Sequence, residues 1–113
     1  MMKIANILKV LADKNRLRIL QLLKRRKLCV CELAYVLRVT QPSISRHLKK
    51  MKVFGFVGQE QASFWTDYYL LRAVDSPRRL VLDTVFKLLN DDPVVKEDLA
   101  RLKKTDRKKL CCK

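Results

Sequence analysis

Glycine and proline are scarce in this sequence, with two glycines and three prolines among 113 residues. Disordered and collagen-like chains are rich in these residues, so both classes are excluded. Because 49% of the residues are apolar, we expect a compact, mostly helical globule. A chain of this length has room for one domain with one core, which a partner subunit would stabilise further.

Long apolar runs are also missing. No 18-residue apolar stretch occurs, and the apolar N-terminal segment has no small-residue cleavage site. We therefore expect no signal peptide, no membrane partner and a cytoplasmic location. In that reducing compartment the four cysteines should be free thiols, open to metal or redox chemistry.

Acidic residues are few: 11 Asp and Glu stand against 26 Lys and Arg, a formal net charge of +15. Such an excess favours a polyanionic partner, with nucleic acid first. Residues 14–27 hold seven cations and residues 40–52 hold four, both without an acid, whereas residues 75–98 hold four cations and six acids. The last segment is suited to avoiding DNA or to meeting protein.

Catalytic groups are scarce as well. The single histidine, His47, has no apparent serine or cysteine partner, and no glycine-rich phosphate loop occurs. We therefore expect that the protein is not an enzyme.

Apolar periodicity predicts a mainly α chain with one small β-hairpin. Helices are expected over residues 2–12, 14–26, 32–37 and 41–54 and from residues 76 and 93 onward, with an extended piece at 28–31 and strands at 56–60 and 64–71. Asp13, Thr40 and Asp92 are the expected N-caps, and Gly55 offers a left-handed stop.

The two helices joined by residues 38–40 make a helix-turn-helix, and the hairpin around Gln61–Ser63 is its wing. The expected fold class is therefore a winged helix-turn-helix. Residues 1–104 are predicted to form one DNA-binding and dimerisation domain, and residues 105–113 a flexible basic tail that carries Cys111 and Cys112.

The helix that starts at Gln41 has two distinct faces. A helical wheel places Ile44, Leu48 and Met51 together toward the core. Cations and hydroxyls on the other side can bind phosphates and base edges in a major groove of double-stranded DNA. The predicted DNA-binding residues are Gln41, Ser43, Ser45, Arg46, His47, Lys49 and Lys50. For His47, which lies beside the apolar stripe, a phosphate contact or packing is favoured over metal ligation.

Four motifs stand out, Leu-Ala-Asp at residues 11–13, Arg-Leu-Arg-Ile-Leu at 16–20, Leu-Cys-Val-Cys-Glu-Leu-Ala at 28–34 and Gln-Pro-Ser-Ile-Ser-Arg-His-Leu at 41–48. Through them the sequence resembles the ArsR/SmtB family of metal-responsive repressors. It implies a dimeric winged helix whose first and last helices pack across the dimer, and repression that is relieved when a metal or metalloid binds.

The sequence departs from the family pattern in three places. The wing turn has Gln61-Ala62-Ser63 in place of the usual glycine and arginine, which weakens the case for wing contacts to phosphate. Ala34 stands where arsenic-sensing members often have a third cysteine. Residues 76–104 contain no histidine, which argues against the zinc site of the family's late helix.

Cys29 and Cys31 are the first candidate metal ligands. They are two positions apart, so both sulfurs reach one ion only if the backbone there is extended or distorted. Soft thiolates select soft ions, and trivalent arsenic or antimony typically takes three of them. The third could be Cys111 or Cys112, because nine tail residues reach at most about 30 Å. Alternatively, the tail pair is a redox pair, a second site or a pair of exposed thiols, and the first pair is merely buried.

Other functions stay open beside the arsenic- or antimony-released repressor. One is a repressor switched by thiol oxidation. Another is an architectural protein that binds DNA through charge alone. An RNA-binding role fits the charge but not the helix-turn-helix geometry.

Overall fold

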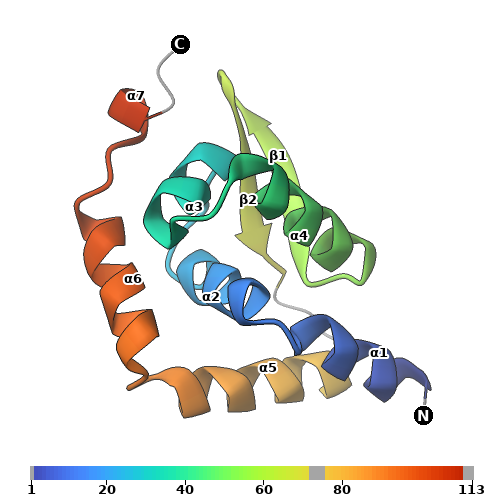
Figure 1. Ribbon diagram of the computed structural model, residues 1–113. Coiled ribbons are helices and arrows are strands. Elements are labelled where there is room, and N and C mark those ends of the chain that lie inside the picture. Colours follow the sequence, from blue (N-terminus) through green and yellow to red (C-terminus); the bar gives the residue numbers. More distant parts are fainter. Residues whose placement is uncertain (1, 72–75, 111–113) are drawn as a thin grey trace.

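The computed structural model describes residues 2–71 and 76–110 (Figure 1). The elements in chain order are α1 (Met2–Leu11), α2 (Lys14–Leu23), α3 (Val30–Leu37), α4 (Gln41–Val53), β1 (Val57–Ala62), β2 (Trp65–Leu70), α5 (Ser76–Leu89), α6 (Pro93–Lys103) and α7 (Arg107–Leu110). The expected mainly α, winged helix-turn-helix fold is confirmed.

The predicted N-cap at Asp13 is confirmed. Its Oδ1 accepts hydrogen bonds from the backbone amides of Asn15 and Arg16, at 2.9 and 3.0 Å. These bonds satisfy two of the amides that a helix start leaves unpaired. At the other end α2 stops at Leu23, three residues before the expected end, and residues 24–27 form an exposed connection.

The first helix of the helix-turn-helix starts two residues earlier than predicted. Cys29 is its N-cap, with an extended backbone (φ −95°, ψ 170°), and its amide donates to Glu32 Oε1 at 3.0 Å. The Cys29 side chain in turn faces the backbone amide of Glu32, so the two residues form a capping box. This cap was not predicted from the sequence because cysteine is not a usual N-cap residue. The extended piece is thus reduced to Leu28 and Cys29, of which Leu28 pairs with Tyr68 of the hairpin.

The second helix, α4, follows the prediction closely. Thr40 Oγ1 accepts from the amide of Ser43 at 3.4 Å, and Gly55 ends the helix with φ 81°. The side chains of Ile44, Leu48 and Met51 are completely buried, as the helical wheel indicated.

The wing is the antiparallel hairpin of β1 and β2. Ala62 pairs with Trp65, so the turn consists of Ser63 and Phe64. The expected turn at Gln61–Ser63 is therefore wrong in position. A two-residue hairpin turn needs positive φ, which Ser63 adopts at 60°.

The last three helices wrap around the first ones, and Figure 1 shows α5 and α6 as an L-shaped outer edge. The predicted cap at Asp92 is confirmed, because its Oδ1 accepts from the amides of Val94 and Val95. α6 packs on α2 and α3, and α7 on α3. Residues 107–110, expected within a flexible tail, instead form a helical turn. The domain division at residue 104 stays a prediction, and Cys111 and Cys112 lie outside the described residues.

Candidate DNA-binding helix and thiol site

The outer face of α4 is basic and open. Of the residues predicted to contact DNA, Gln41, Ser45, Arg46, Lys49 and Lys50 are exposed, and Ser43 and His47 are half-buried. No acidic residue lies on α4. The helix thus presents cations and hydroxyls on one face while its apolar face fixes it to the core.

His47 links α4 to the start of α2. Its Nε2 lies 4.0 Å from Asp13 Oδ1, and its side chain is 17% exposed. Burial lowers the pKa of His47, the charge of Asp13 opposes this shift, and Arg16 and Arg46 add to it. The histidine therefore lies half-buried at the contact between α4 and the cap of α2.

The carboxylates near the wing are paired with cations. Glu60 of β1 accepts from Lys27 Nζ at 2.8 Å, and Asp67 of β2 accepts from Arg107. The tip itself carries Phe64, whose side chain is 80% exposed. The wing therefore presents an uncharged tip.

Cys29 and Cys31 lie together at the start of α3. Cys29 is the buried N-cap residue and Cys31, in the first turn, is half-buried. The backbone is extended at Cys29 and helical from Val30 onward, so the extended geometry expected for this thiol pair is present at the first cysteine. Neither forms a disulfide within the described residues. Residues 2–71 and 76–110 contain no group of three His, Cys, Asp or Glu that could hold a metal ion.

Arg107 of α7 connects the thiol helix to the wing. Its guanidinium donates to Glu32 Oε1 at 2.8 Å and to Asp67 Oδ2 at 3.3 Å, and it lies 4.7 Å from the centre of the Trp65 ring. Hydrogen bonding to Asp67, then to Glu32, raises the pKa of Arg107. No pattern in the basic C-terminal sequence singled out this arginine.

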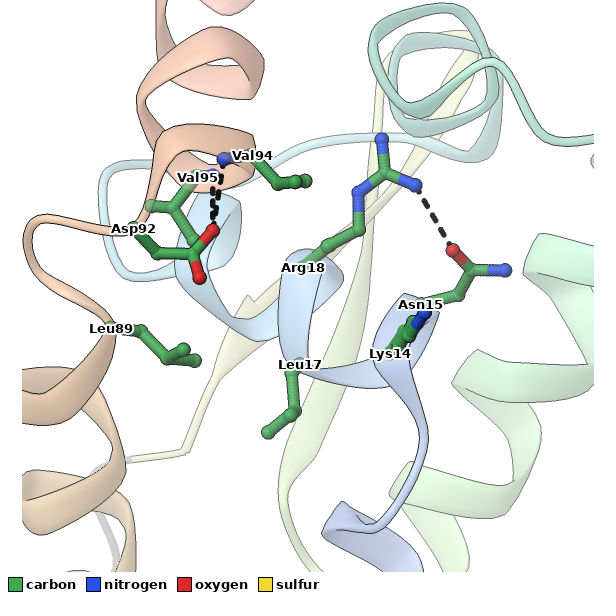
Figure 2. A pocket seen from close by; sticks show the side chains of 8 residues that line it. All are labelled: Lys14, Asn15, Leu17, Arg18, Leu89, Asp92, Val94 and Val95. Carbon is green, nitrogen blue, oxygen red and sulfur yellow. Dashed lines mark hydrogen bonds between the residues drawn. The ribbon is translucent and has the colours of Figure 1, made fainter.

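A small apolar pocket lies between the start of α2 and the α5–α6 junction (Figure 2). Leu17, Leu89, Val94 and Val95 supply its apolar wall. Asp92 caps α6, and Arg18 bonds to Asn15 as the dashed lines show. The charged groups of Asp92 and Arg18 are thus engaged in hydrogen bonds within the protein.

No helix in the described part of the chain is long and apolar enough to span a bilayer.

Comparison with known sequences points to one group of regulators. Residues 13–58, which run from the cap of α2 into β1, match the family described as "Bacterial regulatory protein, arsR family". The chain is 40% identical over 65 residues to the "Arsenic resistance transcriptional regulator ArsR1" of Pseudomonas putida, covering 57% of this chain and 51% of that protein. It is 33% identical over 82 residues to the "Arsenical resistance operon repressor" of Escherichia coli, covering 72% and 70% of the two chains.

Solved structures agree in fold. Reduced HlyU from Vibrio cholerae superposes with a TM-score of 0.67 at 26% identity, covering 77% of this chain and 88% of that one. The transcriptional repressor BigR from Xylella fastidiosa superposes with a TM-score of 0.68 at 22% identity, covering 79% and 85%. The second likeness is one of fold alone.

Proposed function

Because the chain belongs to the arsR family of bacterial regulators and is a DNA-binding repressor rather than an enzyme, we propose that a soft ion, trivalent arsenic or antimony, releases it from its operator. Its relatives named for arsenic resistance support this choice of inducer. The single observation that carries the proposal is the pair of thiols at the start of α3, the first helix of the helix-turn-helix.

The operator is read by the exposed face of α4. Arg46, Lys49 and Lys50 bind phosphates or guanine edges in the major groove, and Gln41, Ser43 and Ser45 near the helix start complete the contacts. His47 contributes a phosphate contact or holds the helix against Asp13. Because phosphate contacts dominate affinity, each cation removed should lower the salt dependence of binding.

Cys29 and Cys31 supply two of the thiolates that a trivalent metalloid prefers. The third comes from Cys111 or Cys112, and the anchoring of α7 supports this. Cys111 follows Arg107 by four positions, a reach of at most about 14 Å. The guanidinium of Arg107 contacts Glu32, whose carboxylate accepts from the amide of Cys29. The chain between Arg107 and Cys111 is thus short enough to let a tail thiol reach the first pair.

Ion and operator binding are coupled through α3. This helix packs on α4, and its N-cap is itself one of the thiol residues. Drawing Cys29 toward an ion competes with the cap bond to Glu32 and shifts the start of α3. Coupling of this kind is reciprocal, so bound DNA weakens ion binding by the same factor.

The chain acts as a homodimer. Large apolar side chains are exposed on two helices that pack together: Ile4 and Leu8 on α1, and Leu80 and Leu88 on α5. Monomeric proteins rarely leave such a surface uncovered. A second copy covers it and presents two α4 helices to two half-sites, which matches the resemblance to dimeric repressors.

The test is fluorescence anisotropy of a labelled duplex from directly upstream of the gene, titrated with reduced protein and then with arsenite at fixed salt. We expect arsenite to release the wild type but not Cys29→Ser or Cys31→Ser. Serine is a good N-cap residue, so we expect Cys29→Ser to keep the start of α3 folded. A loss of the arsenite response in this variant then reports the loss of the thiol. Cys111→Ser and Cys112→Ser identify the third ligand.

Two results would reject the metalloid proposal. Release by diamide with a mass loss that matches a disulfide, and none by arsenite, would indicate a redox-switched repressor. DNA that stays bound under both treatments and without sequence preference would indicate an architectural protein.

A further inference from the structure

We propose that a second basic surface, on the far side of the wing from α4, binds backbone phosphates of the duplex that flanks the operator. This flanking basic surface consists of Arg25, Arg26, Lys27, Lys103, Lys104 and Lys108. The inference rests on the proposed binding of duplex DNA through α4 and extends it to a longer stretch.

The fold brings two distant segments of the chain together here. Arg25, Arg26 and Lys27 lie on the exposed connection between α2 and α3, whereas Lys103 and Lys104 end α6. One open cleft is lined by residues of both segments, including Arg26, Lys27, Lys103 and Lys104. The fields of cations that the fold brings together add up, which raises the local positive potential.

The carboxylates in this cleft do not cancel its charge. Five cations line it, since Arg107 joins the four named above, against the three carboxylates of Glu32, Asp67 and Asp106. Glu32 and Asp67 both accept from Arg107, and Glu32 Oε2 also lies 3.8 Å from the guanidinium of Arg26. Asp106 accepts from the backbone amide of Lys108, at the start of α7. Lys103 and Lys104 are therefore left on the surface as surplus charge.

The position of this surface fits DNA that is already held by α4. Lys27 reaches the wing, where its Nζ lies 2.8 Å from Glu60 Oε2 on β1. β1 also contacts α4, so the hairpin joins the reading helix to the basic cleft. Figure 1 shows α6 and α7 across α3 from α4. A duplex bound along α4 and past the wing tip therefore continues toward the flanking basic surface.

The chemistry selects phosphate over base edges. Lysine acts as a point charge, and the ends of α6 and the α2–α3 connection offer no exposed aromatic platform for unstacked bases among the residues of this surface. Duplex DNA carries about one charge per 1.7 Å of axis, so any flanking sequence presents ligands. The surface should thus raise affinity without adding sequence preference.

The experiment compares a duplex that holds only the footprint protected by the protein with one extended by about one helical turn, or 10 base pairs, at each end. Wild-type protein should bind the longer duplex at least about tenfold more tightly at low salt, and with a steeper salt dependence, by about 0.9 per added phosphate contact. The variant Arg25→Gln, Lys103→Gln, Lys104→Gln should lose this gain and keep its affinity for the short duplex.

The control variant Arg79→Gln, Lys87→Gln, Lys96→Gln removes the same charge from exposed positions on α5 and α6. It should keep the gain from the flanks. Equal gain in both triple variants, or no gain in the wild type, overturns the proposal. The proposal is also overturned if the variant Arg25→Gln, Lys103→Gln, Lys104→Gln loses binding to hairpin RNA but still binds the extended duplex more tightly than the short one. A flank gain that depends on Arg25, Lys103 and Lys104 without sequence preference on the short duplex supports this surface and rejects the operator-reading function.

Discussion

The guanidinium of Arg18 on α2 makes a two-pronged ion pair with the carboxylate of Asp98 on α6. Nε and Nη2 each donate at 2.9 Å, and Asp98 is 1% exposed. Arg101 donates to the same carboxylate, also at 2.9 Å. One buried carboxylate thereby binds two arginines and fixes α6 on α2 of the DNA-binding core.

Asp98→Ala should unfold more easily than the wild type. The substitution leaves two half-buried guanidinium groups without their shared partner, which costs about 3 kcal/mol in the free energy of unfolding. Urea denaturation followed by circular dichroism measures this loss. Glu97→Ala, which removes an exposed partner of Arg101, is the matched control and should cost less than about 1 kcal/mol. Equal costs for the two variants would show that Asp98 is not the anchor.

Arg107→Ala should release α7 from both the wing and α3. Because Glu32 and Asp67 are buried while Arg107 is about a quarter exposed, we expect a loss of about 2 kcal/mol, between the values of exposed and buried pairs. Trp65 is the only tryptophan, and the guanidinium lies over its ring, so its fluorescence should report the release. Arg107→Lys keeps the charge and should retain part of the stability. Unchanged emission and melting in Arg107→Ala would mean that α7 is not held there.

The reading helix was predictable because local signals agree along it. Thr40 caps it, Gly55 ends it, and the spacing of Ile44, Leu48 and Met51 specifies its buried face. The start of α3 was not, because its cap depends on a cysteine amide bonded to Glu32, and cysteine is uncommon in this role. Propensity alone therefore placed the helix two residues late.

The role of the C-terminal segment could not be predicted for a different reason. Lys and Arg in a polar tail are ordinarily solvated, and only the tertiary fold brings Arg107 to carboxylates on α3 and β2. Asp98 was hidden in the same way, since its partner Arg18 is 80 positions away in the sequence. Long-range charge pairs leave no periodic pattern, so sequence spacing does not reveal them.

Gly58→Ala should distort the wing without touching its tip. A Cβ at this position would lie 2.6 Å from Cζ and 2.7 Å from Oη of Tyr69, the residue directly opposite on β2. The ring must move away from the Lys27 ammonium, 5.6 Å from its centre, at a cost of about 1–3 kcal/mol. Thermal unfolding measures the cost. Adding Tyr69→Ala removes the clash, so the double variant should be less destabilised than the sum of the single variants. Additive losses would contradict the contact.

The stability of the protein should fall on mild acidification because of His47. Burial lowers the pKa of this histidine below its ordinary value of 6.5, the carboxylate of Asp13 only partly opposes this, and Arg16 and Arg46 lower it further. Between the folded pKa and 6.5 the unfolded chain therefore binds more protons, so stability is highest above pH 6.5 and is lost as the pH falls through that range. His47 is the only histidine in the sequence, and the pKa of Asp13 is lowered from 3.8, so the carboxylate does not titrate between pH 7.5 and 5.5.

Urea denaturation at pH 7.5 and at pH 5.5 measures the effect. We expect the wild type to lose stability at the lower pH, and His47→Gln, which carries no titrating ring, to lose less. Wild-type stability that rises on acidification would mean that attraction between protonated His47 and Asp13 outweighs burial. The ion pair, rather than the neutral ring, would then hold α4 against the start of α2.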